Sequence, residues 1–263
     1  IFSDANTTLS SNSIIEITKL FYNKKTGCVA GEKKIIKNIK DNAISSGEGL
    51  YWRYESILKE NESNFYSTIG AAGELFAIRT ELFKPIKADT ILDDFEISLQ
   101  IALMGYRIKY SSKAYAIENA STNINEELKR KTRIAAGSFQ TLSRLKKLLN
   151  PFNNFLLWFM YISHKVLRWT VIPLSLPIIL ILNSIIFLNC TNGINFYTIF
   201  FYSQILFYFL ALLGYLFQSK KTKFNFIYVP YYFLIMNLSI IIGFFKHLNK
   251  RQTVIWEKSK RQI

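Results

Sequence analysis

Two long stretches in the second half of the chain are rich in apolar and aromatic residues and carry no charge. No Lys, Arg, Asp or Glu lies between Arg168 and Lys220, or between Lys223 and Lys246. A bilayer crossing takes roughly 20 residues of apolar helix, so the first stretch is long enough for two crossings and the second for one. The pattern predicts transmembrane helices over 168–188 and 196–217, and a third membrane segment over 227–246.

The first half alternates between helical and strand-like periodicity. Apolar positions spaced three or four apart predict helices, and short apolar runs next to glycines predict strands. An alternating α/β order of this kind is typical of a parallel or mixed sheet. The expected order is a strand end at 1–3, a helix over 11–22, a strand over 27–36, a helix with exposed charges over 47–63, a glycine turn and short strand within 69–83, a helix following Asp94, a strand over 107–118 and a basic helical stretch over 126–149.

The segment that joins the two halves, residues 150–167, has aromatic residues, asparagines and a basic end. This composition is typical of an amphipathic helix lying in the membrane interface. A straight crossing by 227–246 would place the basic tail, residues 247–263, outside the cell, against the positive-inside rule. Because Pro230 and Asn237 could break that segment, we expect it to be bent, re-entrant or interfacial, with a cytosolic tail.

Charge separates the same two halves. Residues 1–127 have a net charge of −2, and residues 128–263 have a net charge of +17. A basic, aromatic-rich half is compatible with nucleic-acid binding, but the long uncharged stretches between the charges indicate a membrane protein instead. The two cysteines, Cys28 and Cys190, lie far apart and outside metal-ligand spacing, so neither a disulfide framework nor a zinc site is expected.

Four short motifs in the first 133 residues have side chains suited to chemistry. Asp93 and Asp94 stand at a helix start, where they could cap the helix or perform acid-base catalysis. Asp4 and Asn6 could converge on a cation, although Asp4 could equally be a plain loop acid. Gly70 and Gly73 would let backbone approach a ligand, but glycines more often form a turn. The last motif is a basic cluster suited to diphosphate or to lipid headgroups, formed by Lys129, Arg130, Lys131 and Arg133.

In this order, and followed by membrane helices, "SDANT", "GAAGELFAIR", "LDDFEISLQIALMGYRI" and "KRKTRIAAG" resemble the membrane-embedded family 2 glycosyltransferases, which include cellulose, chitin and hyaluronan synthases. The resemblance implies an α/β fold plus membrane helices: residues 1–149 would be the C-terminal half of a GT-A (Rossmann-like) catalytic domain. It also implies a nucleotide-diphospho-sugar donor and inversion at the anomeric carbon. The chain is expected to lack the N-terminal donor-binding half, and to be inactive as an isolated piece.

The same resemblance implies roles for individual residues. The family's metal-binding Asp-x-Asp corresponds to Asp4 and Asn6, which would hold Mg²⁺ or Mn²⁺, and its base motif ends on Asp94, with Asp93 orienting the loop. Substrate-binding positions are Gly73 and Glu74, Arg130 and Arg133 in the segment that matches Gln-x-x-Arg-Trp, and Trp256 in "TVIWEK".

Two of these positions depart from the family pattern. Asn6 replaces an acid, which implies a weaker metal site. Arg130 and Ile134 replace the Gln and the Trp, and the loss of the Trp favours single addition over processive synthesis.

The sequence thus predicts a multi-pass sugar transferase of the bacterial inner membrane with a cytosolic catalytic domain. Its partners would be the donor, a glycan or lipid-linked acceptor and the lipid bilayer, with no nucleic acid. The product would be a cell-surface polysaccharide or a glycolipid. Two alternatives stay open: a non-catalytic membrane-anchored scaffold, and a polytopic transporter with a cytosolic domain. The apolar segments contain no ionisable residue to mark a transport path.

Overall fold

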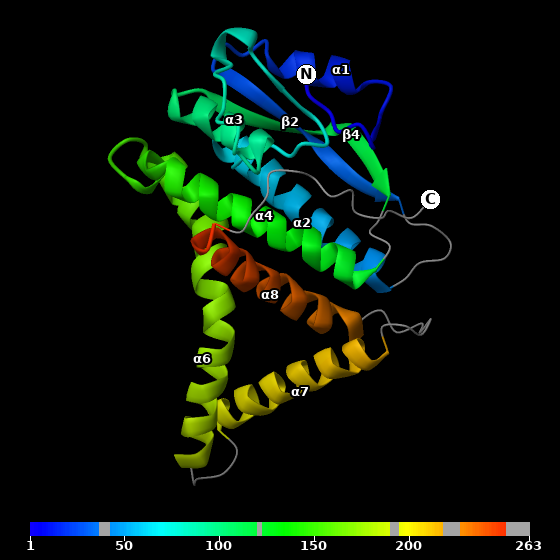
Figure 1. Ribbon diagram of the computed structural model, residues 1–263, viewed down its shortest axis with the longest axis vertical. Coiled ribbons are helices and arrows are strands. Elements are labelled where there is room, and N and C mark those ends of the chain that lie inside the picture. The colour runs from blue at the N-terminus through cyan, green and yellow to red at the C-terminus, as the bar shows by residue number, and fades with distance from the viewer. Residues whose placement is uncertain (37–42, 120–122, 190–194, 218–226, 251–263) are drawn as a thin grey trace.

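A computed structural model describes residues 1–36, 43–119, 123–189, 195–217 and 227–250. Figure 1 shows two regions: a sheet with helices packed against it, and three long helices, α6, α7 and α8, on the side of α4 away from the sheet. Chain order places the sheet region first and the long helices last.

The sheet is mixed, as the alternating pattern predicts. Its strands lie in the order β1-β4-β2-β3, with β2 parallel to β4 and the other neighbours antiparallel. Strand β4 alternates buried and more exposed side chains over much of its length, as expected for period-two geometry. The strand bounds are β1 Thr8–Leu9, β2 Thr26–Ile36, β3 Phe76–Ile78 and β4 Arg107–Asn119.

Helices cover this sheet, and the main apolar core lies between them and the strands. The fully buried side chains of Cys28, Leu99 and Ile108 come from β2, α3 and β4 respectively. Burial raises the pKa of the Cys28 thiol, which therefore stays neutral as a core residue. The elements are α1 Ser13–Leu20, α2 Ala43–Phe65, the 3₁₀ turn η1 Thr80–Leu82, α3 Asp93–Leu103, α4 Ile124–Arg144 and the 3₁₀ turn η2 Lys146–Leu149.

The first long apolar helix differs from the prediction. It runs without a break from Phe155 to Asn189, as α5 (Phe155–Tyr161), a π-helical segment η3 (Ile162–Val166) and α6 (Leu167–Asn189). The helix predicted over 150–167 is therefore not a separate element, and its place in the membrane interface stays a prediction. One side of this segment packs on the protein, since Leu157, Met160 and Tyr161 are buried in the core with residues of α3, and its other side leaves Phe155 and Phe159 exposed.

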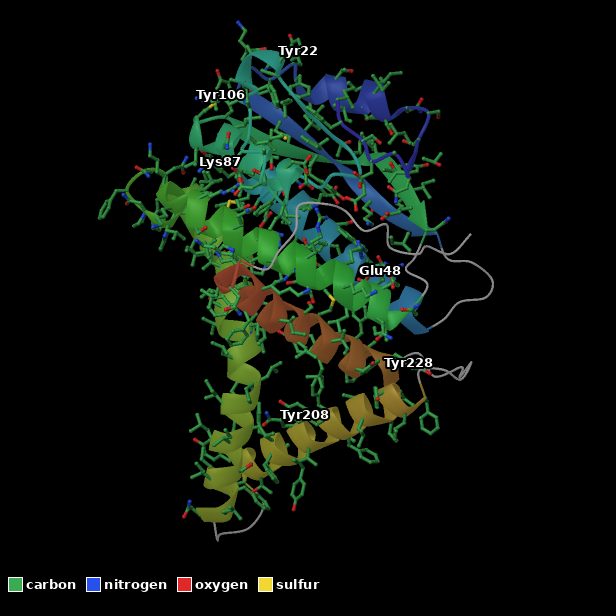
Figure 2. All side chains as sticks on the ribbon, viewed as in Figure 1. Tyr22, Glu48, Lys87, Tyr106, Tyr208 and Tyr228 are labelled. Carbon is green, nitrogen blue, oxygen red and sulfur yellow. The ribbon has the colours of Figure 1, made fainter. Side chains whose placement is uncertain are left out.

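The other two long helices are α7 (Phe196–Leu216) and α8 (Tyr228–Leu248). Each of the three helices has the length and the apolar composition needed to cross a membrane. Figure 2 shows the side chains of α6 and α7 radiating outward, whereas those of α8 on one side meet α4. In the most apolar window of each helix, 6% and 11% of the residues are buried for the first two, against 33% for α8.

Helix α8 lies along α4 (Figure 1). A Cβ at Gly243 would come within 2.5 Å of Ala135 Cβ, so glycine is needed for this close approach. Phe139 and Phe244 pack edge to face at 5.0 Å. The bend expected at Pro230 and Asn237 is not observed, because Pro230 lies in the first turn, where a missing N–H is tolerated. Asn237 Nδ2 donates to a carbonyl one turn back.

Candidate active site

A cleft of about 590 Å³ opens between the sheet region, α2, α3 and α4. This volume lies within the usual range for small-ligand sites. The cleft lining brings together most of the predicted site residues, from segments far apart in the sequence. They are Asp4, Asn6, Gly73, Glu74, Asp93, Asp94 and Arg130. Arg133 is not among the lining residues, and Trp256 lies outside the described residues.

Asp94 is half-buried in the first turn of α3. Its Oδ1 accepts a hydrogen bond of 2.7 Å from Phe95 N. Loss of hydration, then the adjacent charge of Asp93, raise the pKa of Asp94 to about 7, against the partial positive charge of the helix N-terminus. A carboxylate with such a pKa can take up a proton near neutral pH, which a carboxylate of ordinary acidity does poorly.

Gly73 stands between Asp94 and Asp4. A Cβ added to it would lie 3.3 Å from Asp4 Oδ1 and 3.4 Å from Asp94 Oδ2, so both carboxylates border the same small space above the glycine. Gly70 is needed for a different reason. Its φ of +84° belongs to the region that favours glycine, and a Cβ there would overlap the Phe95 ring. The "GAAG" stretch is thus a turn that also leaves room between two acids.

A buried lysine organises the acids at the back of this space. Lys33 forms ion pairs with both Glu74 and Glu118. Burial alone would raise the pKa of Glu74, but the Lys33 ammonium outweighs it and holds that pKa at about 2. Glu74, predicted to bind substrate, lines the cleft as an ionised carboxylate already engaged by Lys33. The sequence did not indicate Lys33, which stands in a strand with another lysine beside it.

Asn6 also belongs to this group. Its Nδ2 donates a 2.8 Å hydrogen bond to Glu118 Oε1. An aspartate at this position would have no proton to donate and would face the Glu118 carboxylate directly. The hydrogen bond therefore gives a physical reason for an amide where the Asp-x-Asp pattern has an acid. The amide oxygen, Oδ1, is left as an acceptor of the kind that hard cations bind.

These residues fit a divalent cation of the sort implied by the resemblance. Asp4 lies exposed at the cleft mouth, and its carboxylate has no hydrogen-bond or ion-pair partner among the described residues. Partial loss of hydration, with the charges of Glu74 and Glu118, raises its pKa. The described part of the chain has no group of three or more His, Cys, Asp or Glu placed to hold a metal. A cation here would therefore need waters or substrate phosphates to complete its shell, as Mg²⁺ commonly does.

The basic cluster of α4 does not form one diphosphate-binding patch, because successive residues of a helix point about 100° apart. Lys129 faces outward and pairs with Glu126. Arg130 is buried, with ion pairs of 2.7 Å to Glu48 and 3.0 Å to Glu127. Arg130, predicted to bind substrate, thus reaches the cleft wall as a structural ion-pair partner. Lys131 points toward α2, where its Nζ lies 4.0 Å from the ring centre of Tyr51.

Arg133 lies beside the carboxylate pair. It is half-buried, and burial lowers its pKa while the charges of Asp93 and Asp94 raise it. Its positive charge therefore favours the ionised form of Asp94, although Arg133 itself does not line the cleft. Ile134, the residue after it, does line the cleft. Aromatic faces come from elsewhere: Trp52 of α2 and Trp169 of α6 line the same cleft.

The largest group that the sequence analysis missed comes from α2 and the start of the long apolar helix. The α2 charges were predicted to be exposed, but Glu48, Glu55 and Lys59 are all buried. Glu55 pairs with Arg168 and Lys165 of the first long apolar helix. Lys33 Nζ lies over the Trp52 ring, 4.7 Å from its centre. The charged residues of α2 at 48, 55, 59 and 62, with Trp52 between the first two, recur at helical spacing, and this stripe was the available signal.

Comparison with known proteins identifies the family and the fold of the chain. A family model described as "Glycosyl transferase family group 2" matches residues 2–246. Among solved structures, the chain is similar to the mannosyltransferase PcManGT from Pyrobaculum calidifontis, in complex with GDP-Man and Mn²⁺, with a TM-score of 0.57 and 18% identity. The alignment covers 95% of this chain and 62% of that one. This likeness shows a GT-A-like fold. Comparison with curated protein sequences gives no match.

Proposed function

We propose, from the premise that this chain belongs to glycosyl transferase family group 2, that it moves a sugar from a nucleotide-diphospho-sugar to an acceptor hydroxyl with inversion. The acceptor would be a glycan or a lipid-linked molecule at the cytosolic face of a bacterial inner membrane. The observation that carries the proposal is Asp94: a half-buried carboxylate with a pKa of about 7 that shares the space above Gly73 with Asp4.

In the proposed reaction, Asp94 takes the proton of the acceptor hydroxyl as its oxygen attacks the anomeric carbon of the donor. The bond from that carbon to the diphosphate oxygen breaks, and the nucleoside diphosphate leaves with the bonding electron pair. Attack from the face opposite the leaving group inverts the anomeric centre. A hydroxyl is a weak nucleophile, so a positioned base supplies much of the rate.

The leaving diphosphate gathers negative charge, which must be offset in the cleft. Asp4 and the amide oxygen of Asn6 would hold Mg²⁺ or Mn²⁺, and a divalent cation supplies Lewis-acid stabilisation of phosphate oxygens. The partner-free carboxylate of Asp4 and its raised pKa, caused in part by nearby acids, support this assignment. Lys33 offsets one of the three negative charges of Asp4, Glu74 and Glu118. The remaining two negative charges are what one divalent cation would balance.

Release of nucleoside diphosphate tests the activity directly. Full-length protein in native membranes would be given GDP-mannose or a UDP-sugar, with and without membrane lipid extract as acceptor. We expect release that depends on both the donor and the acceptor. A protein that binds a donor but never releases the nucleoside diphosphate, with any donor tried, would be a membrane-anchored scaffold.

The membrane arrangement is also proposed. Helices α6 and α7, whose side chains face outward, would form a hairpin through the bilayer. Helix α8, which packs along α4, would lie at the cytosolic interface and keep both ends on that side. The exposed lysines of η2, Lys146 and Lys147, sit beside the start of the long helix, as the positive-inside rule prefers.

A cysteine-labelling experiment tests this arrangement. Asn249, just after α8, is expected on the cytosolic side, and residue 190, just after α6, on the outer side. In intact spheroplasts, a membrane-impermeant thiol reagent should label wild-type protein at Cys190, because Cys28 is fully buried. The double variant Cys190→Ser/Asn249→Cys should be labelled only after permeabilisation. Labelling of that variant in intact spheroplasts would mean that α8 crosses the membrane.

Arg133→Ala should move the pH dependence of transfer. Because the guanidinium charge favours the ionised form of Asp94, its removal should raise the Asp94 pKa, shifting the acid limb of the rate profile upward by up to about one pH unit. Lys129→Ala removes an exposed charge from the same helix and is the matched control. If the acid limb stays in place while the donor KM rises several-fold, Arg133 contacts the diphosphate instead.

A further inference from the structure

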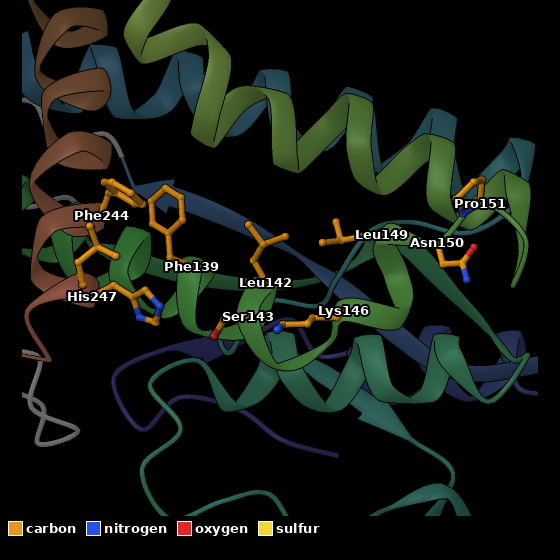
Figure 3. A pocket seen from close by; sticks show the side chains of 10 residues that line it. Phe139, Leu142, Ser143, Lys146, Leu149, Asn150, Pro151, Phe244 and His247 are labelled. Carbon is orange, nitrogen blue, oxygen red and sulfur yellow. The ribbon is translucent and has the colours of Figure 1, made fainter.

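A second cavity, of about 700 Å³, lies away from the cleft and shares no lining residue with it. It is an open groove bordered by the end of α4, by η2 and the residues after it, and by the last turns of α8 (Figure 3). The walls are mainly apolar: Phe139 and Leu142 come from α4, Leu149 from η2, and Phe244 and Leu248 from α8. The edge-to-face pair of Phe139 and Phe244 lies at one end of the groove.

The polar groups at this cavity are cationic or neutral. Lys146 and His247 line it together with Ser143 and Asn150, and none of the described residues that line it is acidic. Further exposed lysines lie close by in the chain: Lys147 is next to Lys146 in η2, and Lys246 precedes His247 in the last turn of α8. An apolar groove with a positive rim is complementary to a molecule that has an apolar chain and an anionic head.

The cavity also joins a surface that suits lipid. Pro151, in its lining, is followed by Phe152, which is 95% exposed, and by Phe155 and Phe159, both more than half exposed. On the other wall, Phe245 and Leu248 of α8 are also more than half exposed. Contiguous exposed aromatic side chains at the start of a long apolar helix are typical of the region where protein meets the bilayer interface.

We propose that this cavity binds one anionic phospholipid of the bilayer. An acyl chain would lie against Phe139, Leu142 and Phe244, and the phosphate would meet Lys146 and His247. The lipid would fill the gap at the point where α8 leaves α4, joining the two helices on the side away from the cleft. This inference rests on the membrane placement in the proposed function, but not on the sugar-transfer chemistry.

Photo-crosslinking tests the site. Full-length protein in phosphatidylcholine nanodiscs would receive a few mole per cent of phosphatidylglycerol with a diazirine in one acyl chain, without donor or acceptor. We expect cross-links concentrated in peptides that contain residues 139–151 and 244–248. Leu142→Trp fills the cavity and should reduce these cross-links at least fivefold. Leu212→Trp makes the same change on the exposed face of α7 and should leave them unaltered.

The headgroup contact has its own pair of variants. Lys146→Glu should lower cross-linking by diazirine phosphatidylglycerol at least fivefold, with little change for diazirine phosphatidylcholine. Lys84→Glu changes an exposed lysine distant in sequence from the cavity and is the control. If Leu142→Trp proves unstable, Leu149→Trp, at a partly exposed edge of the cavity, replaces it.

Three results would overturn the proposal. Equal labelling by both lipids would show that no anionic head is recognised. Cross-links spread evenly over α6, α7 and α8 would show only annular lipid. Displacement of the probe by a polyprenyl phosphate at equimolar amount, but not by unlabelled phosphatidylglycerol, would assign the cavity to a lipid-linked acceptor. Site-specific labelling of a protein that releases no nucleoside diphosphate would support the lipid site and count against the catalytic proposal alone.

Discussion

Asp94→Asn is expected to lower sugar transfer by about 100- to 10,000-fold, the usual contribution of a general base. The amide has nearly the same shape as the carboxylate but cannot accept the proton of the acceptor hydroxyl. Donor binding should be largely retained, because Asp94 is assigned to proton transfer and not to the diphosphate. The measurement is nucleoside diphosphate release at saturating donor, together with donor affinity measured by fluorescence or calorimetry. A variant within a few-fold of wild type would leave Asp94 as no more than a helix-start acid.

The pH dependence should agree with this role. Because the pKa of Asp94 is about 7, the base form is lost as the pH falls below 7, and the wild-type rate should fall with it. The negative charge of Asp93 helps to raise that pKa. Asp93→Asn should therefore move the acid limb to lower pH while leaving most of the plateau rate, which makes it the matched control for Asp94→Asn.

Folding stability gives a further check. The pKa of Asp94 is higher in the folded protein than its usual value of 3.8, so folding favours the protonated form. The stabilisation associated with that form is present below pH 3.8 and is lost as the pH rises through 7. At pH 8 the folded protein holds a partly desolvated charge that Asp94→Asn removes. The Tm of the variant at pH 8 should equal or exceed that of wild type, which would separate a catalytic loss from a folding defect.

Removal of divalent cations is expected to abolish transfer, and Mg²⁺ or Mn²⁺ should restore it. Asp4→Ala should reduce the rate at least 100-fold at moderate metal concentration, because each 1.36 kcal/mol of lost transition-state stabilisation is a tenfold loss. The loss should be partly recovered at high metal concentration if Asp4 acts by holding the cation. Mn²⁺ binding followed by electron paramagnetic resonance gives a reading that does not depend on turnover.

Glu81→Gln is the control for this second prediction. It also removes one carboxylate, but from an exposed position in η1 outside the cleft. It should alter neither the metal requirement nor Mn²⁺ binding. Undiminished turnover of wild-type protein in excess chelator would contradict the metal assignment, and an Asp4→Ala variant with normal Mn²⁺ binding would move the metal site away from Asp4.

Much of the site could be predicted from the sequence because it depends on local signals. A carboxylate pair placed immediately before an apolar periodic stretch locates a helix start, and α3 does begin at Asp93. Glycines next to a short apolar run indicate a tight turn before a strand, and Gly70, with its positive φ, lies in such a turn. The mixed sheet followed by long apolar helices is likewise confirmed. Each of these signals is contained in one continuous stretch of the chain.

Other predictions failed because a periodic pattern does not identify what covers a helix face. The charges of α2 look like a solvated face in the sequence, yet Glu48 and Glu55 are buried because Arg130, Lys165 and Arg168 meet them from other helices. The basic cluster of α4 looked like one patch, but the helix turns Arg130 toward Glu48 and leaves Arg133 beside the acids. The helix expected as a separate element over 150–167 is continuous with the first long helix, and one of its sides packs in the core.

The sequence by itself determined the division into a charged α/β half and an apolar helical half, and it located Asp4, Asn6, Asp93 and Asp94. These features follow from residue type, spacing and hydropathy, which act over a few turns or one strand. Only the tertiary structure placed Asp4 and Asp94 on either side of Gly73, paired Lys33 with Glu74, and packed α8 along α4. Those contacts join residues from 21 positions apart (Gly73 and Asp94) to 108 positions apart (Ala135 and Gly243), and their energies depend on which surfaces fit one another after the chain has folded.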